Sequence, residues 1–110
     1  QYSLHIITNG FEEVQHIKLE NCGLIKYFNH IITSEKVGVK KPNREIFEYA
    51  LEQANTNPKE SIMIGDDLQV DIIAAQNLKI KGIYFNPTKK KVRERNITEI
   101  SCLSELIKIL

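Results

Sequence analysis

Short apolar runs rich in β-branched residues alternate along this chain with longer segments whose apolar residues recur at helical spacing. The short runs lie at residues 3–8, 30–34, 61–65 and 80–86. The helical segments lie at residues 11–22, 40–55, 70–77 and 101–110. Strands that alternate with helices form a parallel sheet joined by right-handed crossovers. The alternation therefore predicts an α/β fold with a parallel sheet.

The size and charge of the chain exclude several classes of protein. Its 110 residues are enough for one small domain with a modest core, and no Gly- or Ser-rich linker interrupts them. Fifteen basic and fourteen acidic residues leave a net charge of +1, which indicates neither a nucleic-acid partner nor a membrane partner. No apolar run is long enough to span a bilayer. Cys22 and Cys102 lack metal-ligand spacing, so we expect reduced thiols in a cytoplasmic protein.

Polar residues follow three of the predicted strands. They are Thr8, Asn9 and Gly10 at the end of the first strand, Lys40 and Lys41 after the second, and Asp66, Asp67 and Asp71 after the third. Ligands bind at the carboxyl ends of parallel strands, so these groups are expected to converge on one rim of the sheet. Carboxylates suit Mg²⁺, while a hydroxyl, backbone amides and a lysine suit phosphate oxygens. The pattern predicts a site for Mg²⁺ and a phosphate group.

Three segments of the chain resemble motifs of the haloacid-dehalogenase-like (HAD) hydrolases. "IITNG", "VGVKKPNREIF" and "IGDDLQVD" are similar, in order and spacing, to the second, third and fourth motifs of that family. The likeness extends from the first residues to about Asn86. It implies a Rossmann-like, three-layer α/β/α core, of which residues 1–110 would be the C-terminal portion of a single domain. Within the family the chain is most similar to the helical-cap subgroup, which includes small-phosphate phosphatases and nucleotidases.

The resemblance also implies roles for residues after the first two predicted strands. Thr8 and the backbone amides of Asn9 and Gly10 would bind the phosphoryl group of a small phosphorylated metabolite. Lys41 would offset the negative charge of the nucleophile and the phosphate, and its neighbour Lys40 is expected to be solvated. The implied reaction is phosphoryl transfer to an aspartate, followed by hydrolysis of the aspartyl-phosphate.

The three aspartates take different roles under the same resemblance. Asp66 would ligate Mg²⁺ directly. Asp71 would orient a metal-bound water or the lysine from outside the ligand shell, although an acid in the first turn of a helix also gains from the helix dipole. Asp67 has two open interpretations: a further metal ligand, or an N-cap whose side chain bonds the first turn of the helix.

One family motif has no counterpart in this sequence. The first motif, an Asp-x-Asp pair, supplies the nucleophile and the general acid/base, but the chain's only aspartates are the three already named. We expect the strand with this pair, and the cap, to lie upstream of Gln1, so that this chain alone lacks turnover. In the family's sheet that strand lies between those ending at Thr8 and Gly65. Both are therefore expected to have an unpaired edge.

Other functions were weighed against the phosphatase. A two-component receiver domain combines similar residues, but there the acids come first in the chain and the Lys-Pro last, whereas here Lys41 precedes the acids. A non-catalytic HAD-like binding or scaffold module remains an alternative, as does a metal-free dehalogenase, which would not need the aspartate cluster. The basic run at residues 89–95 is interpreted as a solvated connection. The sequence does not identify the phosphate ester.

Overall fold

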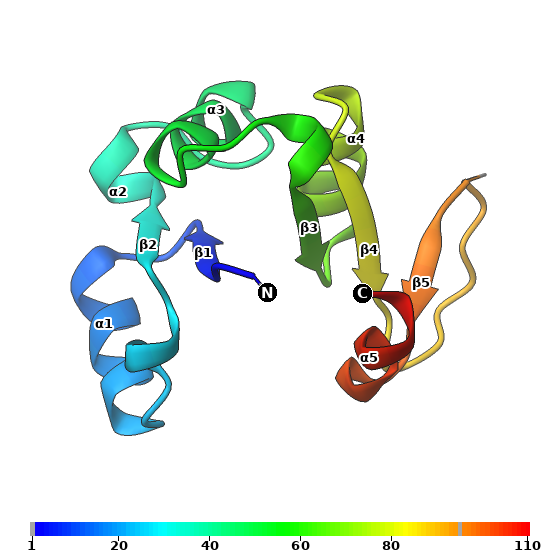
Figure 1. The fold of residues 1–110 in the computed structure, drawn as a ribbon, viewed down its shortest axis with the longest axis horizontal. Coiled ribbons are helices and arrows are strands. Elements are labelled where there is room, and N and C mark those ends of the chain that lie inside the picture. The colour runs from blue at the N-terminus through cyan, green and yellow to red at the C-terminus, as the bar shows by residue number, and fades with distance from the viewer. Residues whose placement is uncertain (1, 95) are drawn as a thin grey trace. The chain divides into compact units, whose positions relative to one another are not determined.

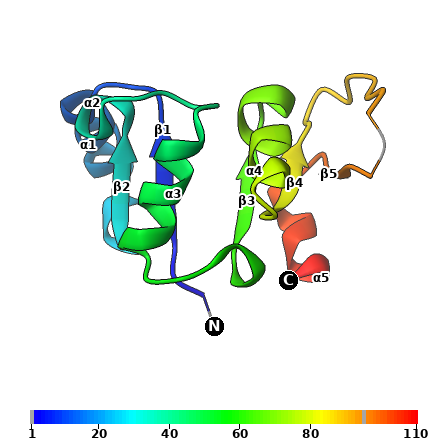
Figure 2. The same cartoon turned by 90° about the horizontal axis from the view of Figure 1, so that it is seen from above.

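The computed structural model describes residues 2–94 and 96–110, without the side chain of Glu12. Gln1 and Arg95, the last residue of the basic run, lie outside the described residues. The chain separates into two compact units, which we call the N-terminal unit (Gln1–Asn57) and the C-terminal unit (Pro58–Leu110). Each unit has its own parallel sheet (Figures 1 and 2). No helix in the described residues is long and apolar enough to cross a membrane.

The N-terminal unit contains a two-stranded parallel sheet and three helices. Its elements are β1 (His5–Thr8), α1 (Glu12–Asn21), a 3₁₀ turn (Ile25–Tyr27), β2 (His30–Thr33), α2 (Ser34–Val37) and α3 (Arg44–Gln53). The strands pair in register from His5 opposite His30 to Thr8 opposite Thr33. One face of α3 is buried, because Ile46, Phe47 and Ala50 recur at helical spacing on it. This face fixes the helix that follows the two lysines.

The C-terminal unit contains a three-stranded parallel sheet in the order β3-β4-β5. Its elements are a 3₁₀ turn (Pro58–Glu60), β3 (Ile62–Gly65), a π-helix (Leu68–Ile73), α4 (Ala74–Asn77), β4 (Lys81–Phe85), β5 (Thr98–Ile100), a 3₁₀ turn (Leu103–Glu105) and α5 (Leu106–Ile109). The π-helix packs closely on the sheet at Gly82, where an added Cβ would lie 2.8 Å from Cγ2 of Ile72. Ile72 and Ile83 are fully buried in this unit.

The structure confirms the α/β class and the four predicted strands, which are parallel. It differs from the sequence prediction in several places, of which three lie in the C-terminal unit. The fifth strand, β5, was missed because three residues are too few to show an alternating pattern. The helix expected at residues 70–77 begins at Leu68 as a π-helix, and the closing helix expected at residues 101–110 is a 3₁₀ turn followed by the short α5.

Each sheet has an open edge on the side where the missing strand was expected. Within the described ranges, β1 pairs only with β2, and β3, at the end of its sheet, pairs only with β4. Beside the open edge of β3, Ile62 and Ile64 are each 37% exposed. An open edge flanked by apolar side chains is a template for pairing with another chain.

We therefore expect residues 1–110, expressed alone, to dimerise, to aggregate or to adopt a loosely packed state. Each backbone group left buried and unpaired costs about 1–3 kcal/mol, against a total stability of about 5–15 kcal/mol for a small domain. Size-exclusion chromatography with light scattering measures the association, and Ile64→Lys, which places a charge beside the edge of β3, should reduce it. A monodisperse monomer that melts cooperatively would contradict this expectation.

Candidate functional site

Thr8 is the last residue of β1, and Asn9 and Gly10 follow it directly, as the sequence predicts for a site at the carboxyl end of a strand. The backbone N–H of Gly10 donates a hydrogen bond of 3.1 Å to Oγ1 of Thr8. A hydroxyl oxygen that accepts one bond can still donate its own proton, so Thr8 retains a donor of the kind that binds an anion. The Gly10 amide, expected to face the phosphate, is directed to Thr8 in this structure.

The side chain of Asn9 connects the end of β1 to the segment that carries Lys41. The Lys41 backbone N–H donates to Oδ1 of Asn9 at 2.8 Å, and Nδ2 of Asn9 donates to the Lys41 carbonyl at 3.2 Å. A third bond of 3.1 Å runs from Oγ of Ser34, the first residue of α2, to the Asn9 carbonyl. The N-terminal unit therefore brings Thr8, Asn9, Gly10 and the Lys41 backbone together.

The two neighbouring lysines have different surroundings. Lys41 is partly buried, whereas Lys40 is exposed. The peptide bond between Lys41 and Pro42 is cis, and α3 begins two residues later at Arg44. The exposure of Lys40 agrees with the expectation of a solvated neighbour, and Lys41 stays the predicted lysine of the site.

One hydrogen bond joins two of the three aspartates at the start of the π-helix. The Asp67 N–H donates to Oδ2 of Asp71 at 3.2 Å, and Oδ1 of Asp67 accepts from the Val70 N–H at 3.0 Å. The second bond is an N-cap, so the structure supports the capping interpretation of Asp67. Asp71 is only 4% exposed and lies over Gly65, where an added Cβ would collide with its carboxylate. A glycine at the end of β3 is what allows a buried carboxylate there.

Asp66 lies one residue beyond β3, and its side chain is exposed. In the part of the chain that the structure describes, no three His, Cys, Asp or Glu side chains are grouped to hold a metal ion. Mg²⁺ does not need such a group, because it retains several waters and binds through one or two carboxylates and a substrate phosphate. An exposed carboxylate at Asp66, with the buried one at Asp71 nearby in sequence, is a donor set of the kind Mg²⁺ uses. The donor chemistry therefore fits this ion.

The predicted site residues belong to two units. Thr8, Asn9, Gly10 and Lys41 lie in the N-terminal unit, and the three aspartates lie in the C-terminal unit. Hydrogen bonds join Asn9 to the Lys41 backbone in the first unit and Asp67 to Asp71 in the second. That both groups share one rim, as the strand rule predicts, remains a prediction.

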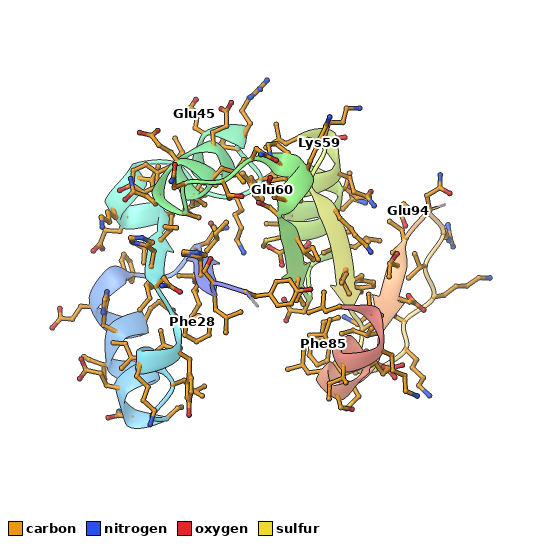
Figure 3. The ribbon with its side chains drawn as sticks, in the orientation of Figure 1. Phe28, Glu45, Lys59, Glu60, Phe85 and Glu94 are labelled. Carbon is orange, nitrogen blue, oxygen red and sulfur yellow. The ribbon has the colours of Figure 1, made fainter. Side chains whose placement is uncertain are left out.

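A buried asparagine that was not predicted from the sequence holds the start of the basic run. Asn86 is only 3% exposed. Its Oδ1 accepts a hydrogen bond of 3.0 Å from the Lys90 N–H, and its Nδ2 donates one of 2.8 Å to the Lys90 carbonyl. Further along, Glu94, labelled in Figure 3, accepts from Nε2 of Gln69 at 3.0 Å. The Asn86-Pro87 pair in the sequence is a turn signal, but a turn signal does not indicate burial. The run up to Glu94 is a connection held at both ends, with exposed lysines between.

The pKa of one residue away from these groups is perturbed. Burial and then the nearby His30 lower the pKa of His5, and the two rings are stacked with centroids 5.3 Å apart. The pair lies where β1 and β2 begin, at the opposite end of the sheet from Thr8. The stacked pair therefore belongs to the packing of the sheet.

Comparison with known proteins identifies the family. A profile of the family described as haloacid dehalogenase-like hydrolase matches residues 1–85, which include all three motif segments. The chain belongs to this family. The resemblance of the three motifs and the expected Rossmann-like core are thereby confirmed.

Similar proteins of the HAD family include phosphatases and nucleotidases. The chain is 41% identical over 109 residues to the pyrimidine 5'-nucleotidase YjjG of Escherichia coli, covering 96% of this chain and 48% of that protein. It is 34% identical over 116 residues to the glyceraldehyde 3-phosphate phosphatase of Methanothermobacter thermautotrophicus, covering 99% of this chain and 51% of that protein. The chain spans about half the length of the curated relatives it matches.

A solved structure with the same fold contains magnesium. The putative HAD-hydrolase YfnB of Bacillus subtilis, bound to magnesium, superposes with a TM-score of 0.89 at 34% identity. The superposition covers 99% of this chain and 48% of that one.

Proposed function

We propose that the full-length protein is a Mg²⁺-dependent phosphatase that hydrolyses a small phosphorylated metabolite through an aspartyl-phosphate. The observation that carries this proposal is the cluster at the end of β1, where the Thr8 hydroxyl and the Asn9–Lys41 hydrogen bonds meet. A hydroxyl donor and a lysine on one loop cluster form a binding set for a phosphate group. The nucleophilic aspartate would come from a part of the protein outside this chain.

Each residue of the set has a distinct part in the proposed reaction. The Thr8 hydroxyl donates to a phosphate oxygen and fixes the orientation of the phosphoryl group. The Lys41 ammonium stabilises the negative charge that the phosphate and the carboxylate nucleophile bring together. Asp66, with Asp71 behind it, would hold Mg²⁺, which when bound neutralises charge on the phosphate. Asp71, buried beside Gly65, keeps its orientation through the Asp67 N–H.

We further propose that the protein acts in the cytoplasm. Nucleoside 5'-monophosphates are the first substrates to test. This choice is supported by the similarity to a pyrimidine 5'-nucleotidase, at 41% identity over 109 residues. Triose phosphates follow, supported by the similarity to a glyceraldehyde 3-phosphate phosphatase. In this family the cap and its loops select the substrate, so the described residues support the reaction more directly than its substrate.

A phosphate-release screen of the full-length protein tests the proposal. The panel contains pyrimidine and purine nucleoside monophosphates, glyceraldehyde 3-phosphate and sugar phosphates, each with Mg²⁺ and with excess EDTA. We expect release that EDTA abolishes and Mg²⁺ restores. Release that is insensitive to EDTA would contradict the metal assignment. No release from any ester, in a protein whose upstream sequence lacks the Asp-x-Asp pair, would instead favour a non-catalytic binding module.

A further inference from the structure

The side chain of Asn9 forms a two-bond link to a residue 32 positions away in the sequence. Its amide pairs with the backbone of Lys41 as one peptide group pairs with another, with one bond accepted and one donated. A single hydrogen bond leaves a loop free to rotate about it, whereas two bonds from one planar group fix distance and direction together. The Lys41 backbone is therefore held in a defined orientation relative to the end of β1.

Asn9 is itself held from a second direction. Its carbonyl accepts from the Ser34 hydroxyl at the start of α2, which directly follows β2. The last two residues of β2, Ile32 and Thr33, are fully buried, so the support for Asn9 comes from the buried end of a strand. Asn9 thus connects three segments: the end of β1, the start of α2 and the segment that carries Lys41.

We infer that Asn9 is a positioning residue that sets the direction from which the Lys41 ammonium approaches the phosphate. The inference rests on the proposed function, since it gives Asn9 a role only through the charge of Lys41. A charge contributes fully to a transition state only when it is fixed in place before the reaction, and a displacement of about 1 Å can cost about 100-fold in rate. Without its two bonds to Asn9, the Lys41 segment loses this constraint.

A purely structural link is the competing interpretation, and the same unit provides an example of one. At the other end of the β1–β2 pair, Oδ1 of Asn29 accepts from the Leu4 N–H at 3.3 Å, and the Asn29 N–H donates to the Leu4 carbonyl at 2.7 Å. Asn29→Ala is therefore a control, because it removes one asparagine side-chain bond to the main chain in the same unit, at the opposite end of the sheet from Thr8, and keeps the bond from the Asn29 N–H. Asn43→Ala is a second control beside Lys41, since the Asn43 side chain makes no capping bond.

The experiment is a double-mutant cycle in the full-length protein. Asn9→Ala, Lys41→Ala and the double variant are compared with the two controls by kcat, KM and melting temperature, using phosphate release from the best ester of the screen. We expect Asn9→Ala to lower kcat by about 10- to 100-fold with a small change in KM. In the Lys41→Ala background the same substitution should lower kcat no further, because a residue that acts through Lys41 has nothing left to position. Both controls should leave kcat within about twofold of the wild type.

Each outcome bears on a different claim. Equal losses of kcat in the wild-type and Lys41→Ala backgrounds overturn the inference, since Asn9 would then act independently of the lysine. An impaired Lys41→Ala beside an unaffected Asn9→Ala also overturns it and leaves the proposed function intact. If Asn9→Ala does not fold, Asn9→Asp, which keeps the acceptor for the Lys41 N–H and loses the donor, replaces it in the cycle. A wild-type protein that releases no phosphate overturns the proposed function and this role together.

Discussion

Lys41→Ala is expected to lower kcat of the full-length protein by at least about 100-fold, while Lys40→Ala leaves it nearly unchanged. Removal of one preorganised charge-stabilising donor costs about 3 kcal/mol in the transition state. Lys41 is partly buried, so solvent screens its charge less, whereas Lys40 is exposed and its charge is screened by water. Steady-state phosphate release from the two variants measures the difference directly.

The adjacent lysine is a close control for this prediction. Lys40 has the same side chain, lies in the same segment and contributes its carbonyl to a hydrogen bond from the Asn43 N–H, which alanine retains. Any general effect of shortening a lysine there should therefore appear in both variants. Equal losses of kcat, or a larger loss for Lys40→Ala, would show that the wrong lysine has been assigned.

Asp66→Asn is expected to abolish Mg²⁺-dependent phosphate release while the protein keeps its fold. The substitution preserves size but removes the negative charge and one oxygen, and Mg²⁺ depends on carboxylate ligands because it gives up water reluctantly. Asp66 is exposed beyond the end of β3, so the melting temperature should change little. Phosphate release is measured over a series of Mg²⁺ concentrations. If phosphate release by Asp66→Asn saturates at the same Mg²⁺ concentration as in the wild type, Asp66 is not the metal ligand.

The neighbouring aspartate separates metal binding from helix capping. Asparagine caps a helix about as well as aspartate, so Asp67→Asn should keep the bond to the Val70 N–H and leave activity close to the wild type. A loss as large as that of Asp66→Asn would assign Asp67 to the metal. The four variants Lys40→Ala, Lys41→Ala, Asp66→Asn and Asp67→Asn thus test the neighbouring candidate residues one at a time.

The predictable part of the fold depended on the length of each pattern. The runs that became β1 to β4 contain at least four residues each, enough for a β-branched apolar run to stand out between helical segments. Thr98–Ile100 is shorter and follows a basic connection, so nothing in the sequence separated β5 from a loop. The open edges were predicted from the family's strand order, which a pattern of apolar residues does not contain.

The predictable part of the site was its residue types rather than their links. The ends of apolar runs pointed to Thr8, Lys41 and the aspartates, and the capping interpretation of Asp67 followed from its position before a helix. The link from Asn9 to Lys41 was not predictable, because a side chain that bonds to a distant backbone leaves no periodic signal. The burial of Asn86 was missed for the same reason, since its partners are main-chain atoms.

Both hydrogen bonds from the Asn9 side chain end on main-chain atoms of residue 41. Every residue has a main-chain carbonyl, and every residue except proline has a main-chain N–H. The two hydrogen bonds therefore do not depend on which side chain residue 41 carries. The shape of this loop is encoded at position 9 and its charge at position 41, and mutation can change either without the other. A related protein with another residue at position 41 would keep the same loop and differ in the charge that this loop carries. Such a division of labour gives natural selection a way to alter chemistry while the architecture is conserved.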